Sequence, residues 1–209
     1  MIKKGIVLAG GTGSRMSPVT KAVNKQLLPL YDKPLIYYPI SILMLAKIKD
    51  ILIIVNKGQV DQFKKVLPNG DNLGIRIRYE EQDKPRGLPD AFLVGEKFIG
   101  NSSVALILGD NFFYGQSLTK RLTNCTRLTA GAKVFLYPVK DPSLYGVATI
   151  GRDDKIISII EKPKKFISNL AVTGLYFFDN KVVEFSKSLK PSKRGEIEIV
   201  DLLNKYKNK

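Results

Sequence analysis

Three glycines and an arginine follow a short apolar run near the N-terminus, in the stretch GIVLAGGTGSRM. Glycine loses much backbone entropy on folding, so the cluster of Gly10, Gly11 and Gly13 indicates a tight turn or a ligand against bare backbone. A glycine-rich turn after a buried strand is where α/β proteins hold phosphate, because exposed N–H groups converge there. Met16 stands where a Rossmann fingerprint needs glycine, and no Gly-Lys-Ser/Thr follows. We therefore expect another kind of phosphate turn, with Arg15 directed towards the ligand.

A carboxylate follows a second apolar run, because VALILGD ends at Asp110. Ligands of α/β sheets bind beyond the carboxyl ends of the strands. An aspartate at such an end suits Mg²⁺, with phosphate oxygens completing the coordination shell. The alternative is a plain turn, since GDN is also good turn chemistry. The strand-end position favours the metal role.

Composition limits which other chemistry the chain can perform. Its 209 residues include no histidine and one cysteine, Cys125. Catalysis by Ser-His or Cys-His pairs is therefore excluded. An internal disulfide and a cysteine-rich metal cluster are excluded as well.

The charge balance is strongly basic, with 34 Lys and Arg against 19 Asp and Glu and a formal net charge of +15. Such a balance indicates an anionic partner, either nucleic acid or phosphorylated small molecules. A lysine-rich solvated surface explains it equally well. No run of five like charges occurs, and the aromatics do not interleave with arginines as in an RNA-binding sheet. We expect no nucleic-acid partner.

The elements that must position these residues follow from hydrophobic patterning. Continuous apolar runs at 6–9, 51–55 and 104–108 predict buried strands. Ile36, Ile40, Leu43 and Met44 have helical spacing, with Pro39 tolerable in a first turn. The other expected strands are at 75–79, 132–138, 147–150, 156–160 and 172–178, with a GRDDK turn at 151–155; the other expected helices are at 59–67, 89–98, 181–188 and 196–206.

Alternation of strands and helices up to residue 108 predicts a doubly wound α/β sheet, and the later strands predict a mixed sheet. The length favours one domain over 1–209. No apolar run could span a bilayer, and the N-terminus lacks a signal-peptide layout, so we expect a cytoplasmic protein without a membrane partner.

Eight motifs in order now point to a known family: LAGGTGSRM, NKQLLPLYDKPLIYYP, GLPDAF, LGDNFFYG, YGV, EKP, AVTGLYFFD and RGEIEIVD. The sequence resembles the sugar-phosphate nucleotidyltransferases over nearly its whole length. The resemblance implies a Rossmann-like three-layer α/β fold with a mixed, mostly parallel sheet. It also implies a nucleotide-binding half at about 1–115 and a sugar-phosphate-binding half at about 116–209.

The implied reaction is Mg²⁺-dependent transfer of a thymidylyl group from dTTP to glucose 1-phosphate, giving dTDP-glucose and pyrophosphate. Arg15 would grip the triphosphate, and Lys25 would lie at the α-phosphate, although a solvated lysine is the alternative there. Gln82 would read the pyrimidine edge, with Gly87 close to the base. The implied nucleotide-binding residues are Leu8, Gly10, Gly11, Gly13, Arg15, Gln82 and Gly87.

The resemblance assigns a second group of residues to the hexose and its phosphate. Lys162 would bind the phosphate and Glu161 a sugar hydroxyl. Arg194 is another candidate for the phosphate, although a charged residue before a helix explains it nearly as well. The implied sugar-phosphate set is Tyr145, Gly146, Glu161, Lys162, Val172 and Arg194; the implied catalytic set is Arg15, Lys25, Asp110 and Lys162, which we expect to face one hollow.

Members of the family continue past RGEIEIVD to a WLDTG-like loop whose aspartate is a second Mg²⁺ ligand, whereas this sequence ends at Lys209. We expect the metal to rest on Asp110 and substrate oxygens. Some of the contacts that form the family's oligomers would be missing. The sequence is still compatible with a homo-oligomer. Two alternatives stay open: an enzyme that forms UDP-sugars from UTP, and a non-catalytic relative that binds nucleotide.

Overall fold

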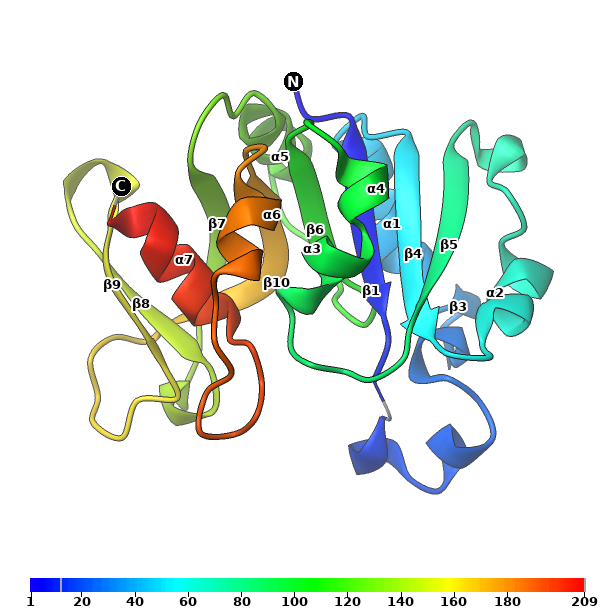
Figure 1. The fold of residues 1–209 in the computed structure, drawn as a ribbon, viewed down its shortest axis with the longest axis horizontal. Coiled ribbons are helices and arrows are strands. Elements are labelled where there is room, and N and C mark those ends of the chain that lie inside the picture. The colour runs from blue at the N-terminus through cyan, green and yellow to red at the C-terminus, as the bar shows by residue number, and fades with distance from the viewer. Residues whose placement is uncertain (12, 209) are drawn as a thin grey trace.

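The computed structural model describes residues 1–11 and 13–208, and within them one sheet holds eight strands (Figure 1). Four strands from the first half of the chain pair in parallel in the order β5-β4-β1-β6. Their bounds are Lys4–Ala9 for β1, Asp50–Asn56 for β4, Arg76–Gln82 for β5 and Val104–Leu108 for β6. Because they run in parallel, all four end at the same edge of the sheet.

The second half of the chain extends this sheet with antiparallel strands. β10 pairs with β6 and also with β7 and β8, and β8 pairs with β9. The bounds are Ala132–Pro138 for β7, Gly146–Ile150 for β8, Ile156–Glu161 for β9 and Leu170–Phe178 for β10. The mixed sheet is confirmed, but parallel pairing prevails only in the first half. A separate small hairpin joins β2, Pro29–Leu30, to β3, Lys33–Pro34.

Helices cover both faces, which makes the expected three layers. Helices α1 (Tyr37–Leu45), α2 (Val60–Val66) and α5 (Leu118–Thr126) pack against one face. The other face carries α3 (Asp90–Val94), α4 (Glu96–Ile99), α6 (Val182–Lys187) and α7 (Ile199–Lys207), which lie in front of the sheet in Figure 1. Neighbouring strand residues alternate between the two cores: Val7 belongs to the first and Ile6 to the second.

Two helix predictions need correction. The helix expected at 89–98 is interrupted at Gly95, which ends α3 and precedes α4. A Cβ on Gly95 would lie 3.1 Å from Ile6 and Leu52, so the chain passes close to the sheet there. Helix α5 was not predicted, although its apolar residues Leu118, Leu122 and Cys125 have i, i+4, i+7 spacing. None of the described helices is long and apolar enough to cross a membrane.

Candidate active site

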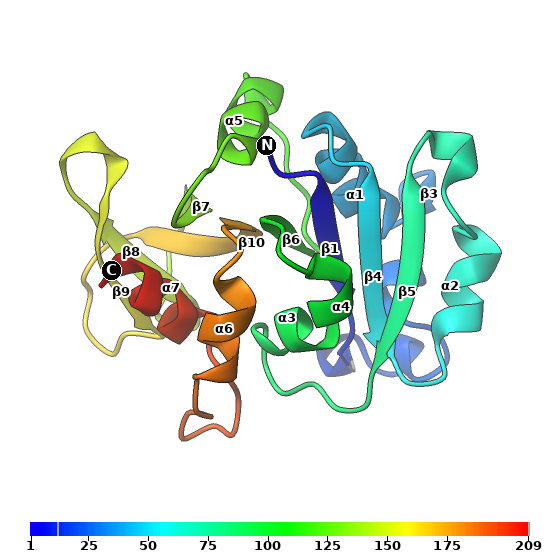
Figure 2. The same cartoon turned by 45° about the horizontal axis from the view of Figure 1, so that its top comes forward.

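The strand order creates a crevice beside the first strand. The chain leaves β1 for a partner on one side, β4, and later returns to its other side as β6, as Figure 2 shows. Loops after β1 and β6 therefore diverge at the carboxyl edge, which is where open α/β sheets bind ligands. A cavity of about 290 Å³ lies there. Its lining residues are Gly10, Gly11, Gly13, Ser14, Arg15, Met16, Lys25, Gln26 and Asp110.

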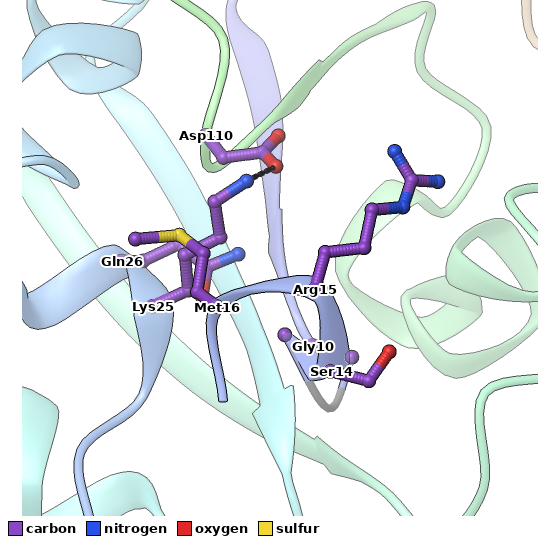
Figure 3. A pocket seen from close by; sticks show the side chains of 9 residues that line it. Gly10, Ser14, Arg15, Met16, Lys25, Gln26 and Asp110 are labelled. Carbon is purple, nitrogen blue, oxygen red and sulfur yellow. Dashed lines mark hydrogen bonds and ion pairs between the residues drawn. The ribbon is translucent and has the colours of Figure 1, made fainter. Parts of the chain in front are cut away.

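Three of the four residues predicted to be catalytic line this cavity (Figure 3). Lys25 Nζ lies 2.7 Å from Asp110 Oδ2, and each side chain is about one third exposed, at 33% and 31%. Arg15 has no ion pair with any residue that the structure describes, and its guanidinium reaches away from the Lys25–Asp110 pair. Among the described residues that line the cavity, Lys25 is therefore paired with a carboxylate and Arg15 is not.

The glycine-rich turn contains positions that require glycine. Gly11 and Gly13 have φ values of +99° and +58°, which side chains disfavour. Gly10 has a different constraint, because a Cβ there would lie 1.9 Å from Nε2 of Gln82 and would displace that side chain. The structure thus brings Gln82 against the glycine turn. Leu8, in the same set, is partly buried within β1.

Asparagine side chains, to which the sequence analysis gave no role, organise the turn. Asn24 is 5% exposed; its Nδ2 donates to the carbonyl of Ala9, and its Oδ1 accepts from the N–H of Gln26. Asn56 forms hydrogen bonds with both backbone groups of Gly11. Their signal in the sequence was position, since Asn24 opens NKQLLP and Asn56 ends an apolar run.

A polar atom without a partner faces the same region. Gln26 lines the cavity and is 5% exposed, and its Oε1 is buried without a hydrogen-bond partner among residues 1–11 and 13–208. A buried acceptor of this kind costs free energy unless something donates to it. Gln26, like the asparagines, was missed by the sequence analysis.

Asp110 is connected to the second half of the chain through its neighbour. Asn111 Nδ2 donates to Asp110 Oδ1 over 3.2 Å, and Asn111 Oδ1 accepts from the backbone N–H of Gly174 over 3.1 Å. Gly174 lies in β10 where the pairing with β7 shifts register. The carboxylate thus has one oxygen near Lys25 and the other near Asn111, which fixes its orientation.

The residues assigned to the sugar phosphate gather separately. Gly146 and Glu161 are register partners in β8 and β9, and a Cβ on Gly146 would lie 3.8 Å from Cβ of Val172. Lys162 has a φ of +44°, and its N–H donates to the carbonyl of Tyr145. None of these residues lines the 290 Å³ cavity. Lys162 is thus not among the lining residues, and the common hollow that we expected for all four catalytic residues stays a prediction.

Arg194 is held by carboxylates. Its Nη2 lies 2.8 Å from Glu198 and 3.1 Å from Glu161, and Glu196 is 3.9 Å away. Burial raises the pKa of Glu161 above its ordinary value of 4.5, and the neighbouring Glu198 adds to the rise, while Arg194 opposes it. The guanidinium offers a phosphate less free charge here than Arg15 does in the cavity.

Gly87 connects the loop after Gln82 to the C-terminal segment. Its φ is +114°, and a Cβ on it would lie 2.1 Å from the carbonyl oxygen of Ile197. The N–H of Ile197 donates to the carbonyl of Arg86 over 2.7 Å. A contact within the chain therefore explains why this position requires glycine.

Comparison with known proteins identifies the family. A family model described as nucleotidyl transferase matches residues 4–209. The chain belongs to this family. It is 54% identical over 203 residues to the glucose-1-phosphate thymidylyltransferase of Neisseria meningitidis serogroup A, covering 97% of this chain and 70% of the relative. It is 51% identical to that of Xanthomonas campestris, covering 98% of this chain and 69% of the relative.

Solved structures of nucleotidyl transferases agree with this assignment. The crystal structure of a putative glucose-1-phosphate thymidylyltransferase from Bacillus anthracis, in complex with a sucrose, superposes with a TM-score of 0.88 at 45% identity and covers 97% of this chain and 82% of that one. A UDP-glucose pyrophosphorylase complexed with UDP-glucose gives a TM-score of 0.83 at 29% identity, covering 100% and 88%. The α/β fold of the family is therefore shown for this chain.

Proposed function

We propose that this chain transfers a thymidylyl group from dTTP to glucose 1-phosphate, forming dTDP-glucose and pyrophosphate. The observation that carries the proposal is the glycine- and cation-lined cavity at the strand-order switch, in a nucleotidyl transferase about half identical to proteins named glucose-1-phosphate thymidylyltransferase. The lower identity to a UDP-glucose pyrophosphorylase, 29%, favours the thymidylyl reaction over the UDP-sugar alternative.

The chemistry suits a chain without histidine. The attacking oxygen belongs to a phosphate and already carries charge, so no base must remove a proton from it. Catalysis then requires two polyanions to be brought into line and the growing charge at the α-phosphate to be offset. In this proposal Arg15 and the backbone N–H groups of the glycine turn hold the triphosphate. Lys25, which lines the same cavity, offsets charge at the α-phosphate.

The residues present fit a magnesium ion held in part by substrate. The structure's described ranges contain no group of three or more His, Cys, Asp or Glu that could hold a metal by itself. Mg²⁺ commonly uses one or two carboxylates and takes its remaining ligands from water and phosphates. Asp110 supplies one carboxylate at the cavity. When bound, the ion would neutralise phosphate charge and orient the triphosphate.

The sugar phosphate would approach from the second half of the chain. We propose that Glu161 and Val172 contact the hexose and that Lys162 contacts its phosphate, because Gly146, Glu161 and Val172 already lie together. Arg194 would have to exchange a carboxylate partner before it could hold the phosphate. We also propose a cytoplasmic location, where nucleoside triphosphates are available.

One assay tests the proposal. Pyrophosphate release is measured with glucose 1-phosphate, Mg²⁺ and, in turn, dTTP, UTP, CTP and ATP; reactions without the sugar phosphate serve as the control. We expect the highest kcat/KM with dTTP. Highest release with UTP would favour a UDP-sugar enzyme instead, and no release with any triphosphate would overturn the proposal.

A further inference from the structure

Asn56 links the glycine turn to Gln82. Asn56 is the last residue of β4 and lies opposite Gln82, the last residue of β5. Its Nδ2 donates to the carbonyl of Gly11 over 2.9 Å, and its Oδ1 accepts from the N–H of Gly11 over 3.0 Å. One side chain therefore satisfies both backbone groups of a residue in the phosphate turn.

These two hydrogen bonds determine which way the Asn56 amide points. A backbone N–H can only donate and a carbonyl can only accept, so exchanging the Nδ2 and Oδ1 positions would oppose like groups at both contacts. The oxygen end of Asn56 is thus fixed, and it is the end nearest Gln82. Oδ1 lies 3.5 Å from Nε2 of Gln82.

The orientation is passed on to Gln82. An acceptor at Oδ1 of Asn56 favours the amino end of Gln82 over its oxygen end, and the 3.5 Å contact makes this a weak hydrogen bond. The side chain of Gln82 is 5% exposed, and its Nε2 fills the space where Gly10 has no Cβ. Within the described part of the chain no group donates to Oε1 of Gln82. The side chain therefore offers a ligand one acceptor of fixed position and its remaining N–H.

We propose that Asn56 is a positioning residue that fixes the orientation of the Gln82 amide and thereby favours thymine and uracil over cytosine. The inference rests on the proposed function, because it takes Gln82 as the group that meets the base. Thymine and uracil carry an N–H at ring position 3, which an acceptor satisfies. Cytosine carries a lone pair there, so in the same register it requires the amide with its ends exchanged. Holding the amide in one orientation converts a group that could serve either base into a selective one.

Binding measurements on the whole chain test this inference. Calorimetry gives the Kd of dTTP and of CTP for the wild type, Asn56→Ala and Asn56→Asp. Alanine removes the acceptor that orients Gln82, so we expect the preference for dTTP over CTP to fall roughly five- to tenfold, the effect of about one hydrogen bond. Aspartate keeps an acceptor towards the N–H of Gly11 and towards Gln82, but it places an oxygen against the Gly11 carbonyl and adds negative charge, so both Kd values should rise while the preference is kept.

Asn24→Ala is the matched control, since Asn24 also braces the turn but contacts Ala9, Gln26 and Gln59 instead of Gln82. Its two Kd values should rise together. An unchanged preference in Asn56→Ala, a preference lost in Asn56→Asp, or no preference in the wild type overturns the inference. If circular dichroism shows that Asn56→Ala is unfolded, the aspartate variant decides. Failure of the proposed function has a separate signature, because the wild type would then release no pyrophosphate.

Discussion

The two candidate binding regions of the molecule each hold an arginine, and the surroundings of these two arginines are opposite. In the parallel half, Arg15 lines the cavity without an ion-pair partner among the described residues. In the antiparallel half, Arg194 lies within 4 Å of three glutamates. A free guanidinium among backbone N–H groups is ready for a polyanion, whereas a paired one must first give up a carboxylate. Arg15 can therefore meet an anion directly, whereas Arg194, like Lys25 beside Asp110, must first exchange a partner.

The two regions also differ in topology. Parallel strands deliver several loop starts to one edge, so short loops can converge on a ligand. The antiparallel strands instead place side chains opposite one another in register, as Gly146 and Glu161 are. Four experiments test how far this contrast holds, and they follow in order of expected effect.

Phe178→Ala tests whether the two halves form one cooperative unit. Phe178 of β10 is fully buried, and its ring meets that of Phe92 of α3 edge-on, with centroids 5.2 Å apart. Truncation leaves a cavity at this junction and should lower the free energy of unfolding by about 3–5 kcal/mol. Urea denaturation measures the loss, and one transition is expected. Phe166→Ala, at a side chain 77% exposed, is the control and should change it by under about 0.5 kcal/mol.

Lys25→Ala tests whether the lysine that lines the cavity takes part in the reaction. Loss of the cation removes charge stabilisation near the α-phosphate and leaves Asp110 without its ion-pair partner. We expect kcat/KM for dTTP to fall by about 100- to 1,000-fold, measured by pyrophosphate release. Lys21→Ala removes the same charge from an exposed position in the same segment and should have little effect. Equal losses in the two variants would contradict a specific role for Lys25.

Gly87→Ala tests the contact between the loop after Gln82 and the C-terminal segment. The added Cβ would meet backbone atoms of Ile197, which cannot turn aside as a side chain can, and the residue has a positive φ. We expect a loss of about 1–3 kcal/mol in thermal or urea unfolding. Gly115→Ala faces open space at an ordinary φ and should be nearly neutral. A stable Gly87→Ala variant would show that the contact is dispensable.

Arg194→Ala tests, by the pH dependence of stability, whether Arg194 stabilises the charged form of its glutamate partners. The pKa of Glu161 is raised in the folded protein, so ionisation of Glu161 lowers the free energy of unfolding. The stability that the protonated carboxyl provides is fully present below pH 4.5 and is lost as pH rises through the raised pKa. Arg194 opposes the rise, so its removal should cost more at pH 7 than at pH 4, by about 1 kcal/mol given the partial exposure of the pair. Urea unfolding at both pH values measures this.

The control for that experiment is Glu161→Gln in the Arg194→Ala background, because the neutral amide removes the titrating group. The cost of Arg194→Ala in free energy of unfolding should then differ less between pH 4 and pH 7. If Arg194→Ala lowers the free energy of unfolding equally at pH 4 and pH 7, Arg194 does not change the pKa of Glu161.

Local patterns were sufficient for most elements. The buried strands around residues 51–55 and 104–108 are continuous apolar runs, and α1 follows the spacing of Ile36 and Ile40, so each could be predicted from nearby residues. The helix at 89–98 could not be delimited, because Gly95 interrupts it through close contact with Ile6 and Leu52, which are distant in sequence.

Residue types and their order were enough to locate a glycine-rich turn with Arg15 after a strand and a carboxylate, Asp110, at another strand end, and to exclude histidine chemistry. These are matters of residue type and local spacing. The fold was needed to show that Lys25 pairs with Asp110, that Asn56 lies beside Gln82 and that Glu161 reaches Arg194. Each of these joins side chains from different strands or loops, and their distances depend on strand order and register, which no local pattern encodes.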